Sequence, residues 1–137
     1  MSALLAVEDA NFYEHGGVSY TGVLRAAVSN LFSKRKQGAS TITQQLARDL
    51  YLTKRQLYSR KFVEALLAFK IESQLSKEKI LEVYMNQIYL GQKAYGFEAA
   101  SLVYFGKSLK ELSIAETAML AGLPQNPAYA NPISNFQ

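Results

Sequence analysis

The sequence predicts an all-α domain, and three observations lead to that prediction. Apolar residues recur at the three- and four-residue spacing of helices along most of the chain. No stretch shows the sustained alternation of apolar and polar residues that a half-buried strand requires. Glycine, serine and proline divide the chain into successive segments, with no internal repeat or low-complexity linker.

The composition restricts which kinds of protein and which partners the chain is compatible with. A chain of 137 residues, 49% of them hydrophobic, is long enough for one domain with a real core. The absence of cysteine excludes disulfides and thiolate metal sites. The net charge of +4 favours anionic partners such as phosphates, lipid head groups or nucleic acid, without choosing among them.

No apolar run approaches the ~18 residues of a transmembrane helix. Because neither end carries a signal peptide or a closing element, we expect residues 1–137 to be one domain truncated at both ends.

The first segment with candidate chemistry starts at two adjacent acids, Glu8 and Asp9, which follow an apolar lead. An apolar environment favours the neutral form of a carboxyl group, which suits proton transfer near neutral pH. Phe12 and His15 follow at helical spacing, and glycines at 16–17 are expected to end the helix. The alternative is a solvated acidic pair at an ordinary helix end.

A second segment, 21–32, is a predicted helix with apolar residues on more than one face, followed at once by the basic run Lys34, Arg35 and Lys36. Apolar surface closed by a basic cluster is typical of a segment lying on an anionic membrane. The alternative is an ordinary core helix with a solvated charge run.

The next helix is expected to begin with a capping box made by Thr41 and Gln44, with Ser40 as the rival cap. Its amino end would offer free N–H groups to an anion, and Arg48 lies four residues after Gln44 on the same face. The alternative is a capped helix with no ligand.

A second acid, Glu64, lies three and four residues after Lys61 and Arg60, so the three share one helix face. The neighbouring cations favour the ionised form of this acid, in contrast to Glu8. Two carboxyl groups in opposite environments are typical of glycosyl chemistry. The alternative is a pair of intrahelical ion pairs worth a few tenths of a kcal/mol each.

The remaining chain is predicted to be helical scaffold. Ser76 is a predicted N-cap, and a helical period follows it up to Gly91. We expect one helix to end at Gly106, and capping boxes to form at Ser108 with Glu111 and at Ser113 with Glu116. The last helix is expected to end at Gly122, because Pro124 cannot continue it.

Four patterns in this order resemble the signatures of the peptidoglycan glycosyltransferase domain, glycosyltransferase family 51, found in bifunctional penicillin-binding proteins and monofunctional transglycosylases. The patterns are Glu8-Asp9-x-x-Phe12-x-x-His15-x-Gly17, Gly38-x-Ser40-Thr41-Ile42-x-Gln44-Gln45, Arg60-Lys61-x-x-Glu64, and Tyr84-x-Asn86-x-x-Tyr89-x-Gly91. The chain departs from the family pattern at Arg48, where lysine is usual, and at Gln56, where a basic residue is common and Arg55 lies beside it. A fifth, basic signature would lie beyond the last residue.

The resemblance implies a lysozyme-like helical fold with a small membrane-associated lobe at about residues 18–50. It implies polymerisation of lipid II with inversion at the anomeric carbon and release of undecaprenyl pyrophosphate. Glu8 would be the general base and Glu64 the second catalytic carboxylate. The substrate-binding residues carried over are Asp9, Phe12, His15, Ser40, Thr41, Gln44, Gln45, Arg48, Arg60, Lys61 and Asn86. For Asn86 the residues themselves favour a structural role as a packed helix-to-loop corner.

The resemblance also implies partners and a location. The partners are lipid II, the growing glycan strand, the membrane surface and phosphoglycolipid inhibitors of the moenomycin type, and not nucleic acid. The location is the outer face of the bacterial cytoplasmic membrane. No cofactor is obligatory, but Mg²⁺ or Mn²⁺ could join the pyrophosphate near Glu64. Two alternatives stay open, a lysozyme-like glycan hydrolase and an inactive membrane-binding fragment.

Overall fold

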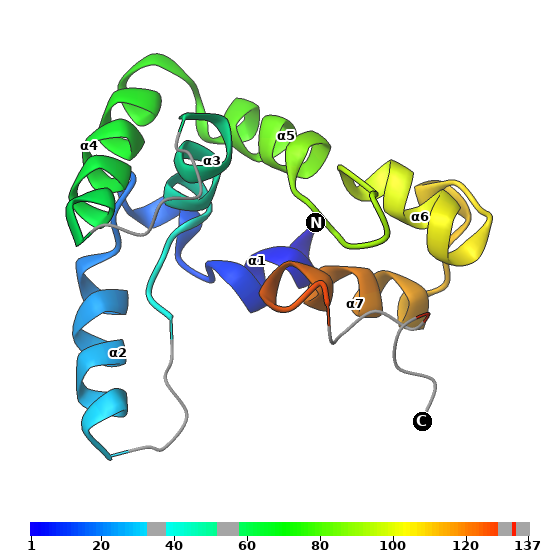
Figure 1. Ribbon diagram of the computed structural model, residues 1–137, viewed down its shortest axis with the longest axis horizontal. Helices are drawn as coiled ribbons and strands as arrows, with labels where there is room; N and C mark the ends of the chain where they lie inside the picture. Colours follow the sequence, from blue (N-terminus) through cyan, green and yellow to red (C-terminus); the bar gives the residue numbers. More distant parts are fainter. Residues whose placement is uncertain (33–37, 52–57, 129–132, 134–137) are drawn as a thin grey trace. The chain divides into compact units, whose positions relative to one another are not determined.

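The computed structural model describes residues 1–32, 38–51, 58–128 and 133, and it confirms the all-α prediction (Figure 1). Within these ranges the only β-type pairing is an isolated bridge between Tyr89 and Tyr95. The α-helices are α1 (Ser2–Glu8), α2 (Tyr20–Phe32), α3 (Ile42–Tyr51), α4 (Tyr58–Gln74), α5 (Lys77–Gln87), α6 (Phe97–Phe105) and α7 (Ile114–Gly122). Short 3₁₀ turns are η1 (Phe12–Glu14), η2 (Leu109–Glu111) and η3 (Leu123–Gln125).

The chain divides into two compact units, and the first combines its two ends, Met1–Ala10 and Leu81–Gln137. In this unit α1 packs on α7, and the side-chain amide of Gln125 donates to the carbonyl of Val7 at 3.1 Å. Apolar residues fill the unit, namely Leu4, Leu81, Tyr84, Ile88, Leu90, Ala94, Phe97, Ala100, Leu120, Ala121 and Leu123. Burial of that apolar surface therefore fixes α1, which carries Glu8 at its last position.

The second unit is continuous and runs from Asn11 to Ile80. Its centre is the pair α3 and α4, which pack on each other. The apolar residues buried in this unit are Phe12, Ala26, Ile42, Leu46, Ala47, Ala68, Ile71 and Ile80. The predicted membrane-associated lobe of about 18–50 falls inside this unit and remains a prediction, and Lys34 to Lys36 lie outside the described residues.

Several helix starts follow the predicted caps. The hydroxyl of Thr41 accepts from the amide N–H of Gln44, and the side chain of Gln44 accepts from the amide N–H of Thr41. The same reciprocal box occurs at η2 and α7. These boxes satisfy amide groups that the first turn of a helix leaves without a partner. The predicted C-terminal glycine is also confirmed, because Gly106 ends α6 in the left-handed conformation.

Two helices end earlier than the sequence predicts. We expected the first helix to reach the glycines at 16–17, but α1 ends at Glu8 and η1 begins only at Phe12. The physical reason is that Phe12 is completely buried in the second unit, and Asp9 takes an extended φ of −160° that turns the chain out of the helix. The helix expected to reach Gly91 ends at Gln87.

Helix α2 exposes most of its apolar side chains, as expected for 21–32. Val23, Leu24, Val28, Leu31 and Phe32 are all exposed, and Leu31 and Phe32 keep 80% and 89% of their accessible surface. Only Ala26 is fully buried on this helix. Across the described part of the chain, none of the helices combines the length and the apolar character needed to cross a bilayer.

Candidate active site

The first carboxylate pair lies at the end of α1. Glu8 is the last residue of this helix, and Asp9 caps it by donating its amide N–H to the carbonyl of Leu5 at 2.9 Å. The Oε1 atom of Glu8 is shielded from solvent, and the side chain of Asp9 is buried. The packing of α1 on α7 therefore places one partly shielded carboxyl group at a fixed helix end.

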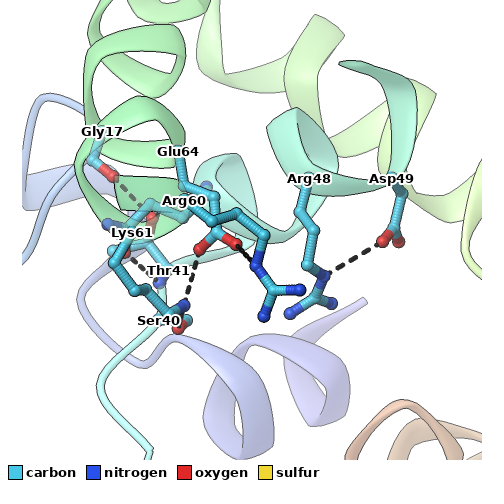
Figure 2. Close-up of polar contacts among 9 residues, drawn as sticks. Gly17, Ser40, Thr41, Arg48, Asp49, Arg60, Lys61 and Glu64 are labelled. Carbon is cyan, nitrogen blue, oxygen red and sulfur yellow. Dashed lines mark hydrogen bonds and ion pairs between the residues drawn. The ribbon is translucent and has the colours of Figure 1, made fainter. Parts of the chain in front are cut away.

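The segment that follows, 12–17, lies against the helices of the second unit. The ring of Phe12 is completely buried and meets the ring of His15 edge-on, with 6.3 Å between centroids. Gly17 has a φ of +94°, in the region that favours glycine. The hydroxyl of Thr41 donates to the carbonyl of Gly17, which ties this segment to the start of α3 (Figure 2).

A charged cluster formed by Ser40, Arg60, Lys61 and Glu64 lies between the start of α3 and the first turns of α4 (Figure 2). The ammonium of Lys61 donates to Glu64 Oε2 at 2.6 Å and to Ser40 Oγ at 2.9 Å. The Nε of Arg60 lies 3.2 Å from Glu64 Oε1. Glu64 is completely buried, whereas Lys61 keeps about half of its side-chain surface.

This arrangement makes Glu64 an anchor for two cations. A buried carboxylate is tolerated only when it is paired, and here each oxygen faces one positive group. Lys61 is held from both sides and cannot swing freely, while its exposed surface stays open to a ligand. The cluster carries two positive charges and one negative charge, so it offers a preorganised net positive field to an anion.

The remaining predicted residues of this unit lie on α3. Gln44 and Gln45 are buried, and Gln44 is used in the helix cap. Arg48 is half-exposed, and its Nε donates to Asp49 at 3.2 Å. In Figure 2 the guanidinium groups of Arg48 and Arg60 extend to the same side of the α3–α4 pair. The structure therefore brings guanidinium groups from α3 and α4 to one side of this helix pair.

Comparison with known proteins identifies the family. A family model described as transglycosylase matches residues 1–137. The chain belongs to the transglycosylase family. It is 57% identical over 135 residues to penicillin-binding protein 1A of Neisseria lactamica and to that of Neisseria gonorrhoeae, covering 98% of this chain and 17% of each relative. It is 55% identical over 133 residues to a Cupriavidus necator protein provisionally named a transglycosylase, covering 97% of this chain and 58% of that protein.

Membership in the transglycosylase family confirms the resemblance on which the lysozyme-like fold was predicted. The roles of the individual residues stay predictions. Asn86 illustrates this, because it is exposed at the end of α5 and its side-chain amide donates to the carbonyl of Glu82 at 2.9 Å. Both its substrate-binding role and its role as a packed helix-to-loop corner stay predictions. Arg55 and Gln56, at the departure from the family pattern, lie outside the described residues.

A metal role for Glu64 also stays a prediction. Both oxygens of Glu64 already face cations, which would compete with a metal ion for the same lone pairs. Among the described residues no group of three or more His, Cys, Asp or Glu side chains comes together as a metal site.

Three polar residues that the sequence did not single out are buried or half-buried beside the site. They are Thr43, Glu72 and Lys77, joined by hydrogen bonds. Glu72 and Lys77 are five residues apart across the break between α4 and α5, a spacing that no helical pattern marks. Thr43 lies inside the second signature, but as a position that the signature leaves free. The available signal was only the presence of two opposite charges near a predicted cap.

Proposed function

We propose that this domain transfers a glycan chain from a lipid pyrophosphate to a sugar hydroxyl, polymerising lipid II into peptidoglycan strands. The observation that carries the proposal is the charged cluster, in which a completely buried Glu64 holds Lys61 beside Ser40. Fixed cations suit a reaction whose leaving group is a pyrophosphate. A hydrolase acting on finished glycan has no such charge to stabilise. Membership in the transglycosylase family supports the same conclusion.

In the proposed reaction the 4-hydroxyl of lipid II, the acceptor, attacks the anomeric carbon of the growing strand. The new carbon–oxygen bond forms on one face while the bond to the pyrophosphate breaks on the other, so the configuration inverts. Glu8 takes the proton of the attacking hydroxyl as general base. The electron pair of the broken bond leaves with undecaprenyl pyrophosphate.

The charge on that leaving group is assigned to the cations of the second unit. These cations are Lys61 and Arg60 on α4 and Arg48 on α3, and Lys61 is hydrogen-bonded to Ser40. Guanidinium and ammonium groups form strong, short hydrogen bonds to phosphate oxygens. We propose that the same groups bind phosphoglycolipid inhibitors of the moenomycin type. In this scheme Mg²⁺ or Mn²⁺ is an addition to the cluster and not a requirement.

The lipid tail of the substrate fixes where the domain works. We propose that it acts at the outer face of the bacterial cytoplasmic membrane, with α2 in the interface. The exposed apolar side chains of Val23, Leu24, Leu31 and Phe32 support this placement, because such surface is stable when lipid covers it. Glycan and lipid are thus the expected partners, and nucleic acid is not.

The first test concerns the base. Glu8→Gln in the full-length protein is expected to lower polymer formation from lipid II by ~10²–10⁴-fold, the usual cost of losing a positioned base. The thermal midpoint should change little, since the side chain keeps its shape. The matched control is Glu78→Gln, an exposed acid in the first turn of α5.

The products of this experiment also separate the alternatives. Near-normal polymer formation by Glu8→Gln ends the assignment of this base. If the wild-type protein cuts finished glycan and makes no polymer, it is a hydrolase. Retention on anionic liposomes without any turnover of lipid II indicates a membrane-binding module.

The second test concerns the charged cluster. Lys61→Ala is expected to reduce turnover of the folded protein strongly. It should also lower the free energy of unfolding by up to ~3–5 kcal/mol, because it removes one partner of the completely buried Glu64. Lys70→Ala is the control, because Lys70 is an exposed lysine on the same helix. A large loss of stability in Lys61→Ala with unchanged activity of the folded fraction would show a structural role instead.

A further inference from the structure

Lys77, the first residue of α5, points back toward the segment that follows the first acids. Its ammonium donates to the carbonyl of His15 at 2.6 Å and to Glu72 Oε1 at 2.8 Å. The same nitrogen lies 4.4 Å from the centroid of the Phe12 ring. Only 18% of its side-chain surface is exposed. One partly buried cation therefore contacts the backbone and a ring of the segment 12–17 and a carboxylate on α4.

Glu72 joins this contact to the second signature. Its Oε1 also accepts a hydrogen bond of 2.6 Å from the hydroxyl of Thr43 on α3. The side chain of Glu72 is 10% exposed, and Thr43 is completely buried. Since the carboxylate is charged and nearly shielded from water, its two partners are needed to offset its lost hydration. A single oxygen thus joins α3, α4 and the start of α5.

Gly17 shows how closely the segment is held on α4. A Cβ atom at this position would lie 3.0 Å from the carbonyl carbon of Ala68 and 3.3 Å from Cγ of Glu72. The carbonyl of Gly17 accepts from the hydroxyl of Thr41, whose neighbour Ser40 accepts from Lys61. The contacts of Lys77 and Glu72 therefore continue, through Gly17 and Thr41, to the charged cluster.

We propose that Lys77 and Glu72 are positioning residues for glycosyl transfer, an inference that rests on the proposed function. Their ion pair fixes segment 12–17 on α3 and α4, and that segment in turn fixes the cap at Thr41 beside Ser40 and Lys61. Neither residue is required to touch the substrate. Displacement of a reacting group by about 1 Å costs ~10²-fold in rate, so a loosened segment lowers turnover without removing any substrate contact.

The experiment compares Lys77→Met with Lys77→Arg, Glu72→Gln and the control Lys70→Met in the full-length protein. Methionine keeps the length and apolar stem of lysine and removes the charge and the donors. Arginine keeps both, and its planar group stacks well on an aromatic ring. Lys70 is exposed on α4 and tests the loss of a lysine as such.

The first readout is amide exchange of the two capping boxes. The amide hydrogens of Thr41 and Gln44 report on the buried cap, and those of Ser113 and Glu116 report on the matching cap of α7. We expect Lys77→Met to speed exchange at Thr41 and Gln44 by about tenfold, while exchange at Ser113 and Glu116 stays unchanged. Lys77→Arg should restore slow exchange.

The second readout is turnover of lipid II. We expect Lys77→Met to lower kcat by about tenfold or more with KM within a factor of about two or three, with recovery in Lys77→Arg. Should Lys77→Met fail to fold, Glu72→Gln takes its place, because it removes the charge and keeps the shape.

Two results would overturn the proposal. One is unchanged exchange and unchanged kcat in both Lys77→Met and Glu72→Gln. The other is a lowered thermal midpoint with normal kcat for the folded fraction, which would make the pair merely stabilising. If the wild-type protein makes no polymer at all, the proposed function fails, whereas the exchange data still decide whether the ion pair holds segment 12–17.

Discussion

Helices α2 and α3 belong to the same unit, yet the more apolar helix, α2, is mostly exposed and the more polar helix, α3, is mostly buried. Helix α2 has Arg25 as its only charge, and only Ala26 is fully buried. Helix α3 contains Arg48 and Asp49 and several amide and hydroxyl side chains, but its first six residues, 42–47, are buried. The more polar helix is thus the one in the core.

Hydrogen-bond partners explain this inversion. Thr43 donates to Glu72, Thr41 donates to Gly17, and Thr41 and Gln44 cap each other. Buried polar groups are well tolerated once they are paired, so α3 can enter the core without an apolar surface on every side. Helix α2 has many apolar groups, and the described residues leave them uncovered. The comparison teaches that specific polar partners, more than apolar content, decide which helix is buried.

The largest effect expected from this comparison is on stability. Leu46→Ala on α3 should reduce the free energy of unfolding by ~2–5 kcal/mol, because Leu46 is 2% exposed and its removal leaves a cavity. Leu31→Ala on α2 is the matched change at a side chain 80% exposed, and it should cost no more than ~0.5 kcal/mol. Denaturant unfolding of both variants checks this. Equal losses would mean that α2 is part of the core.

A smaller effect is expected on membrane binding. The double substitution Leu31→Ser and Phe32→Ser should weaken retention on anionic liposomes, since it removes the two most exposed apolar side chains of α2. The thermal midpoint should stay close to that of the wild type. The matched control is Leu102→Ser with Val103→Ser, two exposed apolar residues on α6. Equal weakening by both pairs would contradict a special role for α2.

The smallest effect distinguishes the buried cap of α3 from the exposed cap of α7. A hydrogen bond from Lys107, together with the cap bonds from Ser113, lowers the pKa of Glu116 from 4.5 to about 2. The stabilisation is therefore fully present above pH 4.5 and is lost as the pH falls through about 2. The cap formed by Thr41 and Gln44 has no titratable group.

Glu116→Gln should consequently flatten the acid side of the stability curve. The measurement is the thermal midpoint of wild type and variant between the ordinary and the lowered pKa. The two curves should converge at the acid end of that range. Parallel curves would show that Glu116 contributes no pH-dependent stability.

The sequence predicted helix class and many helix starts because these depend on local chemistry. The capping boxes at Thr41, Ser108 and Ser113 need only two residues three apart, and all of them form. The exposed apolar surface of 21–32 was expected from the family resemblance, whereas its residues alone favoured a core helix. The early end of α1 was not, since it depends on the burial of Phe12 by distant helices.

The candidate site was predictable only where its contacts join residues that are close in the sequence. The ion pairs of Glu64 with Arg60 and Lys61 follow from helical spacing within α4. The bond from Lys61 to Ser40 spans 21 residues, and the bond from Lys77 to His15 spans 62. A local sequence pattern could therefore not predict either bond. Tertiary packing alone brings these groups together.

The two units differ in when they can form. The second unit is a continuous stretch, and its residues are all present once the chain has been made as far as Ile80. The first unit joins the two ends of the chain, with Gln125 bonded to Val7 across 118 residues. Synthesis proceeds from the amino terminus, and long loops close at a higher entropic cost. Glu8 is therefore made well before α7, and the packing that holds its helix must wait until α7 has been added.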